Sequence, residues 1–588
     1  MTTEHTQSWI VRLWVQIKLG VNNLIREPAF YIYLISVVIY LPWFLPNLSD
    51  IAPWDETYII ASGRGLLSGD LPELGYGPLL SLVAAISYLP FRGSPFWLIH
   101  TNSLYRFLLF SFVFVGAWHA AKALREHFNP LILFGFLFLT PLLTYNFEYP
   151  ADLLFAPISA IAFAQAVYFL HTKAVKYVWW ASFWLGLGML VRGDALILII
   201  GFAVFVLILG WKNHRWWRLI AAAVIPFMAF SVGYVLLRGA VTGNFETGMA
   251  ERSYTAFEQG QEMDMPDEGA RFGAPTESYY VARELFGTPE ENGYSVFRAI
   301  ARNPSAYLRR LVNVLRSLPG LFLTAYYRRY AVLLAVLALR GLVVLIQKKK
   351  IPLAILHLVW ILPLSAGIAR TLVRVGYFRL FFFVVFSLAV MGVKALLDSL
   401  NSTREGLFWV GGASIVLVLA LIVGDAAIQF SMTVFLCWLL LSYLLSKRLA
   451  RLPSWESLAL LLLLSAGLML RGGFLIYETR ELGSEPRESA SLALREFTEP
   501  GDYVLTCTPS VVFLAERQVA NFCGSDIPEF ASSEDFITWM EAQNFFAIYL
   551  DSDSPGIFIE LVRDQKGKSL RQVFGVETGE SSIFIIDQ

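Results

Sequence analysis

Long apolar stretches alternate with short polar ones along the chain, which predicts a bundle of membrane-spanning helices. A spanning helix needs about 20 mostly apolar residues. About thirteen runs reach or approach this length, beginning at Phe30, Ser103, Pro130, Asp152, Tyr177, Ala195, Leu219, Tyr327, Pro352, Tyr377, Leu407, Ile428 and Ser457. One further run, residues 79–91, is short and bracketed by prolines, so we expect it in the membrane interface.

The distribution of basic residues predicts how this bundle is oriented in the membrane. Cytoplasmic loops are the ones enriched in Lys and Arg. If residues 79–91 lie in the interface and do not cross, every second short loop falls on the same side of the membrane as the N-terminus. These loops contain Lys122, Arg125, Lys173, Lys176, Lys212, Arg215, Arg218, Lys348, Lys349, Lys350, Arg404, Lys447, Arg448 and Arg451. We therefore predict a multi-pass membrane protein with a cytoplasmic N-terminus and an extracytoplasmic C-terminus.

This topology divides the chain into three parts. Residues 1–28 mix Trp, Ile and Leu with Arg and Lys, as in an amphipathic helix on the cytoplasmic membrane surface. Residues 29–481 form the transmembrane domain, with long outward loops at 46–101 and 238–318. Residues 482–588 form an outward tail.

The tail is predicted to be a small α/β domain. Strand-like runs at 503–507, 545–551 and 581–586 alternate with helical runs at 533–543 and 555–565. The fold class expected from the sequence is thus an α-helical polytopic membrane protein with a small extracytoplasmic α/β domain.

The composition agrees with a membrane protein and argues against a nucleic-acid-binding function. Hydrophobic residues make up 56% of the 588, charged residues only 16%, and the mean hydropathy is +0.57. Soluble chains contain about 25% charged residues. The formal net charge is zero, so nothing indicates a nucleic-acid partner. Membrane lipids are the partners that this composition implies.

The chain contains three cysteines, too few for a disulfide scaffold or a thiolate zinc cluster. Cys507 and Cys523 both lie in the outward tail. An oxidising compartment allows a disulfide between them. The alternative is that both are small buried apolar side chains.

Two acidic spots lie in outward segments. Asp55 and Glu56 begin an amphipathic stretch that we expect to lie in the outer interface. They are candidates for a catalytic carboxylate, although two acids in a first helical turn also complement the helix dipole. Asp152, after Glu148 and Pro150, is a second candidate, although helix capping alone would explain it.

Several arginines violate the positive-inside pattern. Arg192, Arg370 and Arg374 fall on the outward side of the bundle. One explanation is snorkelling, or pairing with Asp194 or Glu148. The other is a clamp for phosphate, because a guanidinium presents forked donors that match phosphate oxygens. Arg106 and Arg340, within apolar runs, are expected to be mostly structural.

Signatures of several other chemistries are missing from the sequence. It has no Walker loop, no Gly-x-Gly-x-x-Gly after a strand and no His-Glu-x-x-His. Hard cations bind carboxylate oxygens, so a site for a divalent metal ion formed by Asp55, Glu56 and Asp152 is chemically possible. No other cofactor is indicated.

A series of short motifs carries a family resemblance. The motifs follow one another as Asp55-Glu56 with Tyr58, Gly69-Asp70, Tyr76-Gly77-Pro78-Leu79, Arg106, Asp152, and Gly186-Leu187-Gly188 leading to Arg192-Gly193. This order resembles the GT-C superfamily of polyprenyl-phosphate-dependent glycosyltransferases. It is most similar to bacterial members related to protein O-mannosyltransferases and to the aminoarabinose transferase of lipid A. Arg192 stands where the family has Lys, and fuller donor-side motifs are missing.

The resemblance implies a GT-C architecture and an inverting sugar transfer. The donor would be a polyprenyl-phosphate-linked sugar, and the acceptor a hydroxyl of a glycan, lipid or protein on the extracytoplasmic face. Asp55 would be the general base, with Glu56 assisting and Asp152 in reserve. Arg192, Arg370 and Arg374 would contact the donor phosphate, which is the leaving group.

Two other functions compete with this interpretation. A transporter or flippase for a lipid-linked glycan also needs many spans, but transporters usually show internal repeats and mid-membrane charges, which are not evident here. A polysaccharide polymerase or ligase would explain the 238–318 loop but not the early Asp55-Glu56 segment.

Overall fold

The structure is a computed structural model of the full chain. It describes residues 27–44, 55–94, 97–128, 150–211, 216–264, 275–325, 331–373, 380–400, 485–521, 532–551, 556–575 and 581–586, with a few single residues between them. The predicted amphipathic segment at the N-terminus lies outside the described residues, apart from its last two positions. So do the predicted spans that begin at Leu407, Ile428 and Ser457 and nearly all of the span from Pro130.

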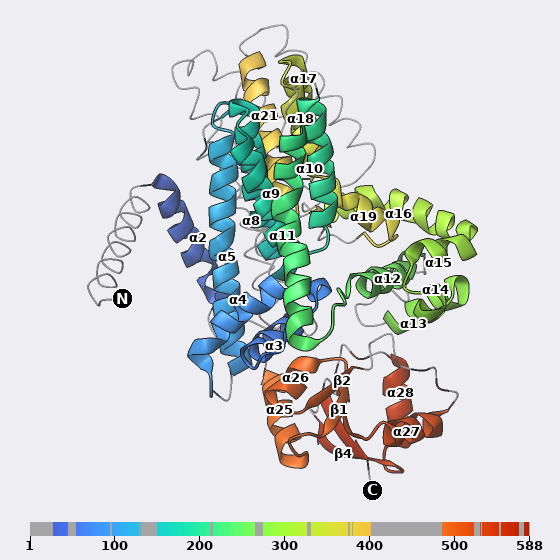
Figure 1. Ribbon diagram of the computed structural model, residues 1–588. Coiled ribbons are helices and arrows are strands. Elements are labelled where there is room, and N and C mark those ends of the chain that lie inside the picture. The colour runs from blue at the N-terminus through green and yellow to red at the C-terminus, as the bar shows by residue number, and fades with distance from the viewer. Residues whose placement is uncertain are drawn as a thin grey trace.

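The described residues form a tall helical bundle with a small α/β domain at one end (Figure 1). The bundle and its outward connections contain the helices α2 (Pro28–Phe44), α3 (Asp55–Leu67), α4 (Pro78–Tyr88), α5 (Trp97–Ala123), α8 (Pro150–Thr172), α9 (Val175–Met189), α10 (Ala195–Gly210), α11 (Trp216–Thr242), α17 (Ala331–Gln347), α18 (Ile351–Val359), α19 (Pro363–Ala369) and α21 (Phe382–Leu400). One core of buried apolar side chains runs through these helices.

Three of the described helices are long and apolar enough to cross a membrane, namely Trp97–Ala123, Ala151–Thr172 and Trp216–Thr242. The pair α18 and α19 adds a fourth if the 41° bend between them lies within one span. The short run expected in the interface forms an 11-residue helix, α4, followed by the turn Leu89–Phe91. The predicted total of about thirteen spans therefore stays a prediction.

Glycines allow the closest helix packing in the bundle. A Cβ on Gly341 of α17 would lie 1.9 Å from Leu388 O, and one on Gly392 of α21 would lie 2.0 Å from Leu337 O. The two backbones are therefore in direct contact. Small residues at helix interfaces are the usual means of close packing in membranes, where apolar surface alone provides no drive for association.

A second helical layer follows α11 and projects from the side of the bundle, near the end where the C-terminal domain lies (Figure 1). It consists of α12 (Met249–Gln259), α13 (Pro275–Phe286), α14 (Pro289–Asn292), α15 (Val296–Arg302) and α16 (Pro304–Ala325). Tyr254, Phe257 and Phe286 form the centre of a small core of its own. The outward loop predicted at 238–318 is thus mostly helical.

The C-terminal domain is a five-stranded sheet with the order β2-β1-β3-β5-β4. β1 is parallel to β2 and β3, whereas β5 is antiparallel to β3 and β4. The domain consists of α25 (Glu485–Phe497), β1 (Tyr503–Thr506), α26 (Pro509–Leu514), β2 (Gln518–Asn521), α27 (Ser533–Ala542), β3 (Phe545–Asp551), α28 (Gly556–Gln565), β4 (Leu570–Gly575) and β5 (Ser581–Ile586).

The predicted α/β character of the tail is confirmed, with three strands and two helices at the expected places. Cys507 is disulfide-bonded and fully buried. Its predicted partner, Cys523, lies outside the described residues, so the pairing of these two cysteines stays a prediction.

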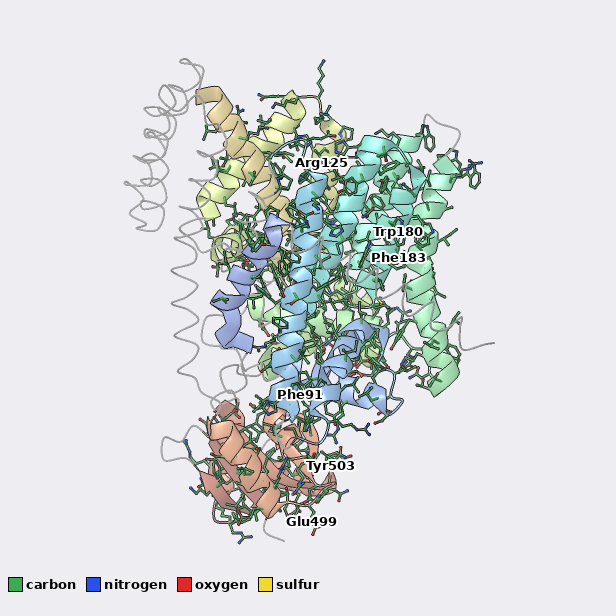
Figure 2. The ribbon with its side chains drawn as sticks, turned by 90° about the vertical axis from the view of Figure 1, so that its left-hand side faces the viewer. Phe91, Arg125, Trp180, Phe183, Glu499 and Tyr503 are labelled. Carbon is green, nitrogen blue, oxygen red and sulfur yellow. The ribbon has the colours of Figure 1, made fainter. Side chains whose placement is uncertain are left out.

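The C-terminal domain contacts the bundle through α26. The ring of Phe513 meets that of Tyr58 on α3 edge to face, with centroids 5.9 Å apart. Leu514 is buried within the bundle's core. Figure 2 shows Glu499 and Tyr503 at this end of the molecule and Arg125, which follows α5, at the other end. The domain therefore lies at the end of the bundle where α3 begins.

Candidate functional site

The first acidic pair lies at the start of α3, and its second member is tied into the bundle. Glu56 accepts hydrogen bonds from Arg106 of α5, with Nε–Oε1 2.8 Å and Nη2–Oε2 2.6 Å. The Glu56 side chain is fully buried and that of Arg106 is 5% exposed. This forked pair fixes the first turn of α3 against α5, which agrees with the structural role expected for Arg106. The side chain of Asp55 lies outside the described residues.

Three of the other predicted site residues form a single cluster together with Asp194. Arg192 pairs with Asp152 through Nη1 and with Asp194 through Nη2, the latter at 2.8 Å. Arg370 Nη2 lies 3.5 Å from Asp194 Oδ1. The cluster thus joins the first turn of α8, the turn between α9 and α10, and the end of α19. We call these four residues the arginine–aspartate cluster.

An aromatic side chain completes this cluster. Arg370 Nη2 donates to the Tyr377 hydroxyl at 2.7 Å, and the Arg192 guanidinium lies 5.5 Å from the centre of the Tyr377 ring. Arg370 Nη1 has no acceptor among the described residues. The side chains of Arg192 and Arg370 are 21% and 22% exposed, so the cluster is partly open. Arg374 lies outside the described residues.

The first-loop motif and the turn that contains Arg192 lie side by side. Gly77 adopts φ +71°, and a Cβ there would lie 2.9 Å from Val191 O. Leu79 N donates to Leu190 O at 2.9 Å. Glycine suits this position because both the backbone conformation and the close approach exclude a side chain. The Tyr76-Gly77-Pro78-Leu79 motif therefore holds the turn before Arg192 in place.

Charges within the arginine–aspartate cluster balance. Two guanidiniums face two carboxylates, Asp152 and Asp194, whose side chains are 4% and 7% exposed. Burial by itself lowers the pKa of Arg192, but the charges of Asp152 and Asp194 outweigh it, so the net shift raises the pKa and the guanidinium stays charged. If a further anion bound here, it would have to replace one of the two carboxylates as a partner of an arginine, or another cation would have to join the cluster.

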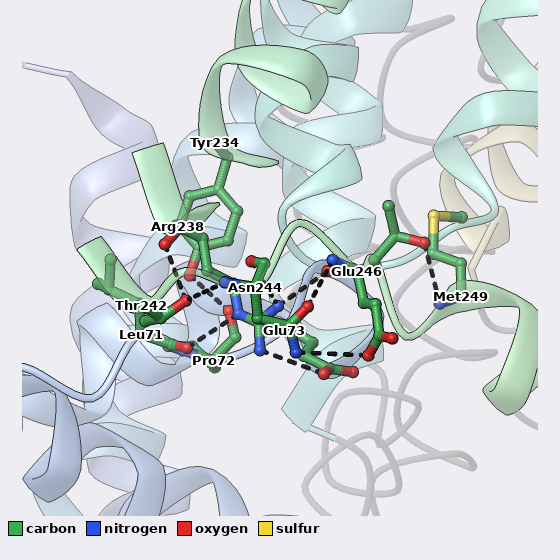
Figure 3. Close-up of polar contacts among 10 residues, drawn as sticks. Leu71, Pro72, Glu73, Tyr234, Arg238, Thr242, Asn244, Glu246 and Met249 are labelled. Carbon is green, nitrogen blue, oxygen red and sulfur yellow. Dashed lines mark hydrogen bonds and ion pairs between the residues drawn. The ribbon is translucent and has the colours of Figure 1, made fainter. Parts of the chain in front are cut away.

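Two arginines that the sequence did not single out hold separate segments of the chain together. Arg238, near the end of α11, donates to Leu71 O at 3.2 Å and Glu246 O at 2.9 Å, and pairs with Glu73 at 3.2 Å (Figure 3). It thereby ties the segment before α4 to the segment after α11. The signal was present in the sequence, because a cation at the predicted outward end of a span departs from the positive-inside pattern.

Arg310 is the second of these arginines. It is fully buried in α16, lies over the rings of Phe257 and Phe286, and donates through Nη2 to Phe257 O at 2.5 Å. Burial lowers the pKa of Arg310 to about 10. Nearby, the Tyr307 hydroxyl donates to Ala369 O at 3.1 Å. These contacts connect the side layer of helices to the segment that carries Arg370.

No group of three or more His, Cys, Asp and Glu side chains that would suit a metal ion occurs within the part of the chain that the structure describes. Glu56 and Asp152 belong to different ion pairs, one with Arg106 and one with Arg192. The metal site considered from the sequence would also need Asp55, so the described residues do not test it.

Solved structures share this architecture, whereas neither a protein-family model nor a curated protein sequence matches the chain. ArnT from Cupriavidus metallidurans bound to undecaprenyl phosphate aligns with a TM-score of 0.54 at 14% identity, covering 95% of this chain and 98% of ArnT. The apo oligosaccharyltransferase of Archaeoglobus fulgidus aligns with a TM-score of 0.51 at 13% identity, covering 96% of this chain and 75% of that protein.

The alignments cover nearly the whole chain, including the C-terminal domain. Both structures are of GT-C enzymes, so the GT-C architecture expected from the motifs is confirmed as the fold of this chain. At this level of identity the likeness concerns the fold, and the chemistry has to be argued from the side chains.

Proposed function

We propose that this chain, which has the GT-C fold, is a membrane glycosyltransferase. It transfers a sugar from a polyprenyl-phosphate donor to an acceptor hydroxyl on the extracytoplasmic face. The observation that carries the proposal is the partly open arginine–aspartate cluster, in a fold shared with an ArnT structure that holds undecaprenyl phosphate. Forked guanidiniums beside an accessible edge suit a phosphate.

In this proposal the donor phosphate contacts Arg192 and Arg370. Arg370 Nη1 offers a donor that no described residue uses. Because the cluster is already neutral, phosphate binding displaces Asp152 from Arg192 or recruits Arg374 as a third cation. The cationic donors then stabilise the negative charge that grows on the phosphate as it leaves.

The acceptor hydroxyl is activated by Asp55. Asp55 begins α3, and the adjacent Glu56 is fixed by Arg106, so the first turn of α3 is held in place. Asp55 takes the hydroxyl proton while the hydroxyl oxygen bonds to the anomeric carbon. The bond from that carbon to the phosphate oxygen breaks, and the lipid phosphate departs with the electron pair. A single displacement inverts the anomeric centre. Glu56 assists by positioning α3, and Asp152 is the reserve base.

The remaining parts of the proposal concern the surroundings of the site. We place the protein in the bacterial inner membrane with about thirteen spans. Its cytoplasmic segment comprises residues 1–28, its transmembrane domain residues 29–481 and its extracytoplasmic domain residues 482–588. The acceptor is a glycan, lipid or protein that enters from the aqueous side, between the outward helices and the C-terminal domain.

A transfer assay tests the function. Membranes with wild-type protein or Asp55→Asn are incubated with radiolabelled polyprenyl-phosphate sugars, and label in the acceptor fraction is counted. General-base catalysis typically contributes about 10²–10⁴-fold, so Asp55→Asn should lose at least a hundredfold in rate while its Tm stays near that of wild type. Normal transfer by the variant would remove Asp55 from the mechanism.

A second assay, with the wild-type protein in proteoliposomes, distinguishes the proposal from transport. If no donor supports transfer, and proteoliposomes instead move a lipid-linked sugar across the bilayer, the chain is a flippase and the glycosyltransferase proposal is wrong.

A further inference from the structure

A cavity of about 220 Å³ lies at the opposite end of the bundle from the C-terminal domain. It lies where α17, α21 and the turn after α5 come together. Glu126 and His127 in its lining follow Arg125, which Figure 2 shows at this end of the molecule. Its lining consists of Glu126, His127, Val344, Leu345, Lys348, Lys350, Met391, Lys394 and Ala395. This is the predicted cytoplasmic side, far from the arginine–aspartate cluster.

Positive charge dominates the rim of this cavity. Lys348, Lys350 and Lys394 line it, and none of them forms an ion pair with a carboxylate among the described residues. The one acidic side chain in the lining, Glu126, lies 3.4 Å from His171 Nδ1. Three ammonium groups around one hollow repel one another unless an anion lies between them.

A fourth potential donor lies within the same lining. His127 Nε2 is buried and has no hydrogen-bond partner among the described residues, while Lys394 Nζ donates to His127 O at 2.8 Å. Burial, then Lys350 and His171, lower the pKa of His127 against the opposing effect of Glu126. A buried imidazole nitrogen without a partner is costly. An anion in the cavity would accept from it.

The turn between α17 and α18 brings two of the lysines to the cavity. Lys349 adopts φ +57°, a left-handed conformation that is unfavourable for a residue other than glycine. Lys349 N donates to Ile346 O at 2.9 Å and Lys350 N to Leu345 O at 2.8 Å, which closes the end of α17. Lys348 and Lys350, on either side of Lys349, both line the cavity.

We propose that this cavity binds a phosphate group. The cationic rim matches the charge of a phosphate, and the floor of Val344, Leu345, Met391 and Ala395 matches an apolar substituent on it. Cytoplasmic loops are generally rich in lysine, which would explain why basic residues occur on this side. It does not explain why three lysines line the same cavity as the buried His127 Nε2, which has no hydrogen-bond partner among the described residues. The phosphate belongs either to an anionic lipid headgroup or to a free anion.

Ligand-induced stabilisation of the full-length protein tests the proposal and separates the two sources. Protein in phosphatidylcholine nanodiscs is titrated with dioctanoyl phosphatidylglycerol or with sodium phosphate, at constant ionic strength, and the Tm is followed. The test variant is K348Q/K350Q. The matched control is K173Q/K176Q, which removes the same charge on the same side from residues outside the cavity.

The proposal predicts that wild type and K173Q/K176Q are stabilised alike. K348Q/K350Q removes two of the three lysines that line the cavity, so it should bind about tenfold more weakly or worse. Saturation by the lipid alone assigns a headgroup site, and saturation by phosphate alone assigns a free anion. Stabilisation by neither, or equal stabilisation of K348Q/K350Q and wild type, overturns the proposal. If K348Q/K350Q fails to fold, K348Q alone is compared with K176Q.

Discussion

The pair Glu56–Arg106 and the arginine–aspartate cluster lie at the same end of the bundle but are built differently. In the pair, one carboxylate accepts two hydrogen bonds from one guanidinium, and the two side chains are 0% and 5% exposed. In the cluster, Asp194 is shared between Arg192 and Arg370, and both arginine side chains are about one-fifth exposed. The pair is closed, whereas the cluster has an open edge.

The difference separates charges that hold the fold from charges that are available to a ligand. A buried forked pair has its main donors and acceptors in use, and separating it leaves a charge in an apolar environment. In the cluster, Asp194 can remain paired with one arginine while the other arginine binds a phosphate. We therefore expect changes in the pair to act on stability and changes in the cluster to act on transfer.

The largest effect on stability should come from Glu56→Gln. It leaves the Arg106 charge buried without a counter-charge, which typically costs about 3–5 kcal/mol. The Tm should fall sharply, as followed by thermal unfolding in detergent. The double variant E56M/R106M, which removes both charges at similar volume, should recover most of the loss. A Glu56→Gln protein as stable as wild type would show that the pair does not hold α3.

The next effect in size should be on transfer by Arg192→Lys. Lysine keeps the charge but cannot contact Asp152 and Asp194 in a forked manner, so we expect the rate to fall by about 10–100-fold with only a small change in Tm. Arg252→Lys is the matched control, because Arg252 also lies over a tyrosine ring, that of Tyr76, but outside the cluster. Equal transfer rates for Arg192→Lys and Arg252→Lys would show that the arginine–aspartate cluster has no special role in transfer.

The smallest effect should follow from Phe513→Ala. The variant removes the ring contact with Tyr58 through which the C-terminal domain meets α3. An aromatic contact contributes about 0.5–1.5 kcal/mol beyond its buried area, so we expect faster proteolysis of the C-terminal domain and a severalfold loss of transfer. Leu492→Ala, at an exposed position of α25, is the control. Unchanged proteolysis and transfer would make this contact incidental.

The sequence predicted the elements whose pattern is set by burial. β1, β3 and β5 lie inside the sheet and read as apolar runs, so they were found. β2 and β4 are its edge strands and contain polar residues such as Gln518 and Arg571, so they were missed. Local periodicity is weakest where only one side of a strand is paired.

The contacts among the candidate residues were predictable only in part. Arg192, Asp152 and Arg370 were singled out because charges that interrupt apolar runs require an explanation. Pairing with Asp194 was one of the explanations that the sequence offered, and the structure shows it for both Arg192 and Arg370. That both arginines share this one carboxylate could not be predicted, because Arg370 lies far from Asp194 in the chain. Arg310 was not singled out for a similar reason, because its burial depends on Phe257 and Phe286 of other helices.

Binding of undecaprenyl phosphate to Arg370→Gln and to Arg309→Gln tests the central claim most directly. Arg370 Nη1 is a donor that no described residue uses, at the open edge of the cluster, whereas Arg309 of α16 pairs with Asp264 at 3.1 Å. The account predicts that Arg370→Gln weakens binding by about tenfold or more and that Arg309→Gln binds as wild type does. Wild-type affinity in Arg370→Gln would contradict the assignment of the arginine–aspartate cluster as the phosphate site.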